Sequence, residues 1–172
     1  MASAYDKYYE QQPPAVKVIV AAGVGLLGYS IYRAVKRNQE EKDAAKAAAA
    51  AAAELAALAA QGVYPSYGDS QFYVFVNTLV QAMTGCGTDE TMIYQVFRQI
   101  RNEADIRRLI QLFGVQYYQP CVWTSPVSYT VWQVNDKAYG GDLATWLSYD
   151  LGQTEVSNIN SILKGNGLNF QF

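Results

Sequence analysis

The feature that most constrains this chain is a low-complexity stretch at residues 38–61. It reads NQEEKDAAKAAAAAAAELAALAAQ and is dominated by alanine, the residue with the highest intrinsic helix propensity. Acidic side chains near its start interact favourably with the helix dipole. We therefore expect residues 38–62 to form one helix, roughly 36 Å long at 1.5 Å per residue. Gly62 and Pro65 should end it, because neither residue continues a helix easily.

Two roles fit such a helix. It could be a solvated spacer that lifts a domain off a surface, or its alanines could pack against other helices in an oligomer. The stretch lacks a repeat of apolar residues at heptad spacing, which an oligomeric coiled coil would need. The sequence therefore favours the spacer.

The segment before this helix, residues 15–37, is predicted to be a transmembrane helix. Its uninterrupted apolar run is short, but flanking Lys and Arg side chains can reach the interfaces, which extends the span toward the roughly 20 residues that a bilayer requires. Tyrosines suit the interface, and glycines allow close helix packing. The predicted membrane-embedded residues are Val18, Ile19, Val20, Val24, Leu26, Leu27 and Ile31, and the predicted interface anchors are Lys17, Tyr29, Tyr32, Arg33, Lys36 and Arg37.

The charges beside this segment predict its orientation. Three basic residues, Arg33, Lys36 and Arg37, follow the apolar run, whereas only Lys17 lies close before it. By the positive-inside tendency, the C-terminal part of the chain should face the cytoplasm or an equivalent interior. Residues 1–14 are polar and rich in tyrosine, and we expect a flexible tail there.

The same segment contains a G-x-G-x-x-G pattern at residues 23–28, which in another context would indicate dinucleotide binding. A nucleotide-binding unit needs a second strand with an acidic residue about 20 residues further on. Polyalanine occupies that position here. A membrane helix is the favoured interpretation, and a buried core or interface helix is the remaining alternative.

The composition argues against an enzyme. The chain has no histidine, which removes the usual general base and the commonest transition-metal ligand. Cys86 and Cys121 have no zinc-ligand spacing, and two free thiols are favoured over a disulfide. The net charge of −2 gives no basic field for nucleic acid. Four acids that could form a hydrolytic pair are better explained as helix-terminal or surface residues: Glu90, Glu103, Asp142 and Asp150.

Residues 63–172 have the periodicity of a small helical domain. Three successive apolar stripes predict helices, with Ser70, Thr88 and Asn102 as their N-caps and Gly114 as the stop of the third. Residues 115–140 break the pattern and predict a long loop or small hairpin. Two short helices should follow, at about Asp142–Leu151 and, capped by Thr154, at about Glu155–Leu163. The predicted core residues are Phe72, Phe75, Val76, Leu79, Val80, Met83, Ile93, Val96, Phe97, Ile100, Ile106, Leu109, Ile110, Phe113, Leu143, Trp146, Leu147, Val156, Ile159 and Ile162.

A loop lies between the first two of these helices. It reads Met83-Thr84-Gly85-Cys86-Gly87-Thr88-Asp89-Glu90. Together with the stripe from Ile93 to Phe97, Arg101-Asn102-Glu103, Asp142-Leu143 and Asp150-Leu151, this loop resembles an annexin repeat. Single modules of this kind are met in bacterial and bacteriophage proteins. The resemblance covers about residues 69–165 and implies a five-helix domain in which residues 115–140 are an insertion.

The resemblance also implies a calcium site. In annexins the loop supplies backbone carbonyl oxygens, and an acidic residue between the last two helices completes the coordination. Here the ligands would be the carbonyls of Met83, Gly85 and Gly87 and the carboxylate of Asp150, a set of oxygens that suits calcium. No other cofactor is expected. A loop with a purely structural role is favoured over a calcium site.

The predicted fold is therefore mainly α: a transmembrane helix, a long alanine-rich helix, and a small annexin-repeat-like domain of five helices with an inserted loop or hairpin. We expect a non-enzymatic, membrane-anchored structural or interaction protein, and the resemblance points to a bacteriophage virion or membrane-assembly component. Its partners would be the lipid bilayer, other structural or membrane proteins, and further copies of itself. The alternatives are a calcium-dependent membrane-binding module and a soluble assembly protein whose N-terminal helix packs against a partner.

Overall fold

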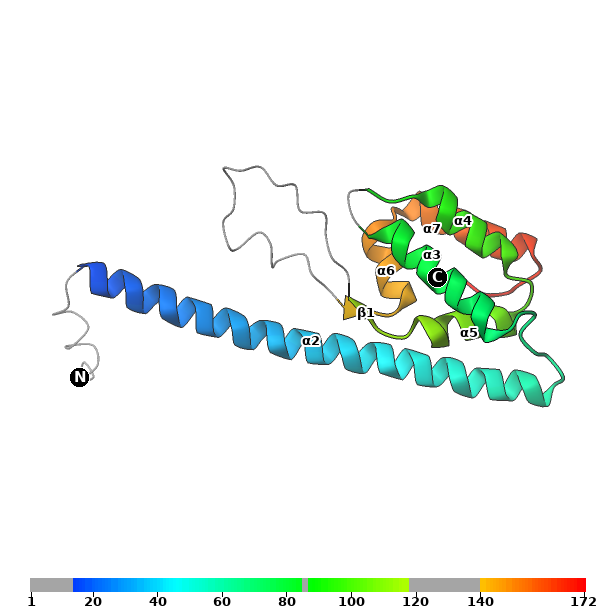
Figure 1. Cartoon of the computed structure of the whole chain (residues 1–172), viewed down its shortest axis with the longest axis horizontal. Helices are drawn as coiled ribbons and strands as arrows, with labels where there is room; N and C mark the ends of the chain where they lie inside the picture. The colour runs from blue at the N-terminus through cyan, green and yellow to red at the C-terminus, as the bar shows by residue number, and fades with distance from the viewer. Residues whose placement is uncertain (1–13, 85–86, 118–139) are drawn as a thin grey trace. The chain divides into compact units, whose positions relative to one another are not determined.

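The computed structural model describes residues 14–84, 87–117 and 140–172, without the side chains of residues 14–31 and 33. The chain divides into two compact units, residues 1–39 and 40–172. The described ranges are mainly helical, as predicted (Figure 1). The elements are α2 (Pro14–Ala60), α3 (Asp69–Met83), α4 (Glu90–Gln99), α5 (Glu103–Phe113), β1 (Gln116–Tyr117), β2 (Gly140–Gly141), α6 (Leu143–Asp150) and α7 (Gln153–Gly165).

Helix α2 is one continuous helix of 47 residues. The predicted division at residue 37 is therefore not a break in secondary structure. The helix ends where the sequence predicts, because Gly62 adopts a φ of 81°. Its N–H donates to the carbonyl of Ala59 over 3.0 Å, and the N–H of Val63 donates to the carbonyl of Leu58 over 2.9 Å. These bonds satisfy carbonyls that the end of a helix otherwise leaves without partners.

Among the residues whose side chains are described, no helix is both long and apolar enough to span a bilayer. The predicted membrane segment depends mainly on residues 15–31, whose side chains lie outside that set, so the transmembrane helix stays a prediction. The predicted tail and both cysteines also lie outside the described residues.

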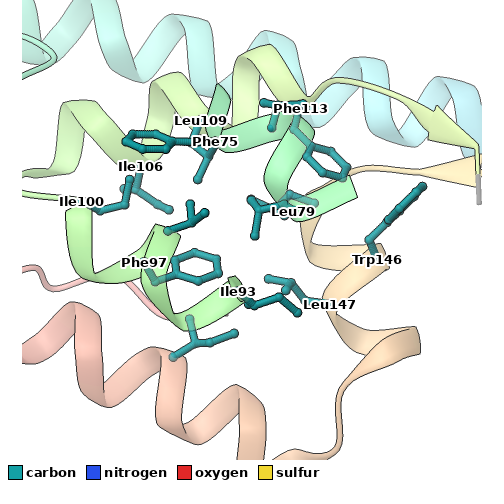
Figure 2. Packing of buried hydrophobic residues seen from close by; sticks show 14 of the residues in the cluster. Phe75, Leu79, Ile93, Phe97, Ile100, Ile106, Leu109, Phe113, Trp146 and Leu147 are labelled. Atoms are coloured by element: carbon teal, nitrogen blue, oxygen red, sulfur yellow. The ribbon is translucent and has the colours of Figure 1, made fainter. Parts of the chain in front are cut away.

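Five helices, α3 to α7, enclose the hydrophobic core of the second unit. Helix α3 contacts both α4 and α5, and α7 packs against α4 (Figure 1). Figure 2 shows side chains from α3, α4, α5 and α6 pointing toward one another in this core. The apolar stripes of the sequence are confirmed, since most of the predicted core residues are buried. Val80, Ile110, Val156 and Ile162 are half-buried and pack against this core.

Two predicted helix signals at the third stripe are confirmed. Asn102 caps α5, and its side chain accepts a hydrogen bond from the N–H of Asp105 over 2.9 Å. Gly114 follows the helix with a φ of 55°, a conformation that L-residues with a Cβ rarely adopt.

Three other cap predictions are wrong. Helix α3 begins at Asp69, after Gly68 rather than Ser70, and α7 begins after Gly152 rather than Thr154. At α4 the cap is Asp89, whose carboxylate accepts from the N–H of Met92 over 3.0 Å. Thr88 cannot be distinguished from Asp89 by residue type, because both are good N-caps. The caps of α3 and α7 carry no side-chain hydrogen bond.

The predicted insertion enters and leaves the domain at one point. Strands β1 and β2 pair antiparallel, with Gln116 opposite Gly141 and Tyr117 opposite Gly140. Only glycine fits at residue 141, because a Cβ there would lie 2.6 Å from Cγ2 of Thr145. Residues 118–139, including the β-prone segment 129–134, lie outside the described part of the chain. The expected hairpin is thus confirmed only at its base.

A pair of substitutions in α3 tests this core. Leu79 is fully buried, whereas the Val74 residue is 54% exposed. We expect Leu79→Ala to lower the free energy of unfolding by about 3 kcal/mol, through lost apolar burial and the cavity left behind. Val74→Ala should change it by less than about 0.5 kcal/mol. Chemical denaturation of the two variants provides the measurement, and equal losses would contradict the assigned inner face of α3.

Candidate functional site

The loop from Met83 to Glu90 lies beside the end of helix α6. Across the loop, the N–H of Asp89 donates to the carbonyl of Ala82 over 2.9 Å, and Gly87 adopts a φ of 103°. The hydroxyl of Thr88 is 3.4 Å from the carbonyl oxygen of Asp150, to which it donates, although the two residues are 62 positions apart. The structure therefore brings together the loop and the acidic residue that the sequence predicted for one site.

The four predicted calcium ligands have different surroundings. The side chain of Met83 is fully buried in the core, Gly87 is exposed, and Asp150 is half-buried. Gly85 lies outside the described residues. Within the described ranges, no three or more His, Cys, Asp or Glu side chains gather into a metal-binding group. A site built mainly from backbone carbonyls would not need such a group.

The long connection of residues 118–139 does not separate the two parts of this candidate site. Its ends are held together by the pairing of β1 with β2, and α6 begins one residue after β2. Asp142 caps α6, accepting from the N–H of Thr145 over 2.8 Å. Helix α6 consequently starts at a fixed place, and its last residue, Asp150, reaches Thr88.

A second candidate site is the contact between α2 and the helical domain within the second unit. The carboxylate of Glu40 accepts from the N–H of Gly140 over 3.0 Å, and the hydroxyl of Tyr117 donates to the carboxylate of Glu41. Further along α2, Arg107 of α5 forms an ion pair of 2.5 Å with Glu54. Helix α2 is thus held at two places, about six and about two helical turns before its C-terminal end.

In residues 40–60 the predicted spacer is covered along one side. The buried and half-buried apolar positions recur every three or four residues, and the side chains at them are Ala44, Ala47, Ala48, Ala51, Ala52, Leu55, Leu58 and Ala59. The sequence does not reveal this seam, because alanines lie on the exposed side of α2 as well as on the covered side. The apolar pattern therefore does not identify which alanines are covered.

Sequence analysis also missed a buried carboxylate, that of Asp105. It is fully buried and accepts hydrogen bonds from the N–H of Ser66 over 2.5 Å and of Arg101 over 2.9 Å. The side chain of Asn102 donates to the carbonyl of Tyr64 over 3.1 Å and to the hydroxyl of Ser66 over 3.0 Å. This Asp105 network attaches the linker between α2 and α3 to the start of α5. An acidic residue three positions after an N-cap, as in a capping box, was the available signal.

Comparisons with protein-family models, with curated proteins and with solved structures find no match. The resemblance to annexin repeats therefore stays a prediction from the residues that carry it. Any function must be argued from the geometry described above.

Two substitutions of Asp separate the buried carboxylate from an ordinary helix cap. Asp105→Ala should lower the free energy of unfolding by about 3 kcal/mol, because it leaves the N–H groups of Ser66 and Arg101 without this acceptor and a cavity where the buried carboxylate was. Asp89→Ala, at an exposed cap, should cost about 1 kcal/mol. Thermal and chemical unfolding of both variants measures the difference. If Asp105→Ala lowers the free energy of unfolding no more than Asp89→Ala does, the buried carboxylate does not hold the linker.

Proposed function

We propose that this is a non-enzymatic structural or interaction protein in which helix α2 anchors a small helical domain to a membrane. The observation that supports this most is the continuity of α2. One helix contains both the apolar sequence of residues 18–29 and the segment that packs on the domain.

The contacts at the two ends of residues 40–60 support the role of α2 as the carrier of the domain. At the beginning of this segment, Glu40 and Glu41 bind the paired strands. After its end, Tyr64 and Ser66 are bound by the Asp105 network. A domain attached at both places follows its helix more closely than one on a flexible linker would.

The roles of the acidic side chains support a non-enzymatic protein. Asp89 and Asp142 cap helices, Asp105 holds the linker, Asp69 pairs with Arg108, and Glu54 pairs with Arg107. Each of these carboxylates has a structural task. With no histidine in the chain, general acid–base chemistry lacks its usual group.

In this proposal the partners are the lipid bilayer and other structural or membrane proteins, as in a virion or a membrane assembly. The basic residues after the apolar run favour an orientation with the helical domain on the cytoplasmic or interior side. If the N-terminal helix instead packs against a protein partner, the same architecture serves a soluble assembly protein.

Membrane fractionation tests the anchor. The full chain should sediment with membranes and resist extraction at alkaline pH, because a spanning helix is held by its apolar length. Deleting residues 15–35, or introducing Val20→Asp with Leu26→Asp, should release the protein into the soluble fraction. The matched control is Val20→Ile with Leu26→Ile, which should stay in the membrane. If the full-length chain, with residues 15–35 present, is already found in the soluble fraction, the membrane anchor is contradicted and the soluble assembly protein is favoured instead.

A second candidate function is calcium-dependent binding to a membrane surface. The contact between Thr88 and the carbonyl of Asp150 favours it, because it places the acidic residue beside the glycine loop despite the insertion. Calcium would there be held by oxygen ligands alone.

Calcium titration tests this candidate directly. At a calcium concentration about ten times the dissociation constant, binding to the folded state should add about 1.4 kcal/mol of stability. The melting temperature should rise with millimolar calcium, and Asp150→Asn should remove most of that rise. Asp142→Asn, at a helix cap away from the loop, serves as the control. A melting temperature that does not change with calcium would exclude this function and leave the loop a structural element.

A further inference from the structure

The hydrophobic core of the second unit is complete without helix α2. All buried members of the core, and all half-buried apolar residues packed against them, lie between Tyr67 and Phe172. Ala44 and Ala51 of α2 are buried, but neither belongs to this core. Residues 40–60 therefore form an outer layer that could leave without opening the interior of the domain.

The surface that residues 40–60 cover presents hydrogen-bond donors to them. It includes the guanidinium of Arg107, the hydroxyl of Tyr117 and the N–H of Gly140, which together define the helix-receiving face. Helix α2 supplies the carboxylates of Glu54, Glu41 and Glu40 in return. The face thus recognises a helix with acidic residues at these spacings and small side chains between them.

The contacts that hold residues 40–60 on the domain are weak enough to break and form again. The side chains of the ion pair between Arg107 and Glu54 are 28% and 48% exposed, so water competes for both groups. The apolar residues in the seam are mostly alanines, which bury little area each.

A short hinge connects α2 to the domain. After Gly62 the chain is held again at Tyr64 and Ser66 by the Asp105 network, so only residues 61–63 would need to change conformation. Gly62 has a φ of 81°, and open space surrounds the position of a Cβ there. The turn that returns the chain to its own domain therefore depends on glycine at this one position.

We propose that the helix-receiving face binds residues 40–60 of a second copy of this chain, so that two copies assemble by exchanging α2. The second copy is the occupant because it carries the same carboxylates and the same alanine seam as the segment that covers the face in one chain. Exchange preserves every contact except those of the hinge, and higher concentration favours it. This inference names a partner and does not depend on whether residues 15–37 cross a membrane.

Complementary charge reversals test the exchange. Glu54→Arg brings two cations together within one chain, and Arg107→Glu brings two anions together within another. When both full-length variants are mixed, exchange restores one Arg–Glu pair at each face. If the two variants carry different tags, purification by one tag should then recover the other variant in a one-to-one ratio. The recovered amount should be several-fold larger than when either variant is mixed with the wild type in the same buffer or detergent.

Two controls keep this test decisive. The double variant E54R/R107E restores the pair within a chain and should show wild-type association, with a wild-type circular dichroism spectrum. A mixture that stays unpaired while this double variant folds would overturn the proposal, whatever the fractionation experiment finds.

Hinge variants provide a second measurement that leaves the face intact. Gly62→Ala disfavours the positive φ of the turn and should raise the fraction of paired copies several-fold in sedimentation experiments. Gly165→Ala is the matched control, because its Cβ also meets nothing within 4 Å but its φ is not in the left-handed region. Equal behaviour of the two variants would contradict exchange at this hinge.

Discussion

The arrangement of the second unit depends on one buried carboxylate, that of Asp105. Its two oxygens accept from the N–H groups of Ser66 and Arg101, and a buried carboxylate without such donors would be strongly destabilising. Because Ser66 belongs to the linker and Arg101 to the turn before α5, these bonds attach the linker between α2 and α3 to the start of α5. The path by which residues 40–60 pack on the domain follows from that attachment.

The domain and α2 are held by different kinds of interaction. Phe75, Leu79, Phe97 and their neighbours form a core of large apolar side chains (Figure 2). Residues 40–60 are held by carboxylates and alanines instead. Burial of large side chains gives most of the stability of a small domain, whereas exposed polar contacts chiefly select position. This difference makes α2 the element of the second unit that can separate from it, and it links the proposed anchor to the proposed exchange.

The candidate loop shows how a long connection can leave a distant contact intact. Residues 118–139 connect two paired strands of two residues each. The ends of this connection are adjacent, and Asp150 at the end of α6 lies beside Thr88. Spacing along the chain therefore does not limit which residues meet at this loop.

The sequence by itself determined the helical class, the apolar faces of α3 to α7, the cap at Asn102 and the stops at Gly62 and Gly114. These features depend on periodicity and on local backbone preferences, which each segment carries alone. Tertiary structure decided the rest. Asp89 rather than Thr88 caps α4, and Thr88 instead reaches the carbonyl of Asp150. The positions of Arg107, Tyr117 and Gly140 decide which side of α2 is buried. The sequence alone does not indicate that side, because alanine occurs on nearly every side of the helix.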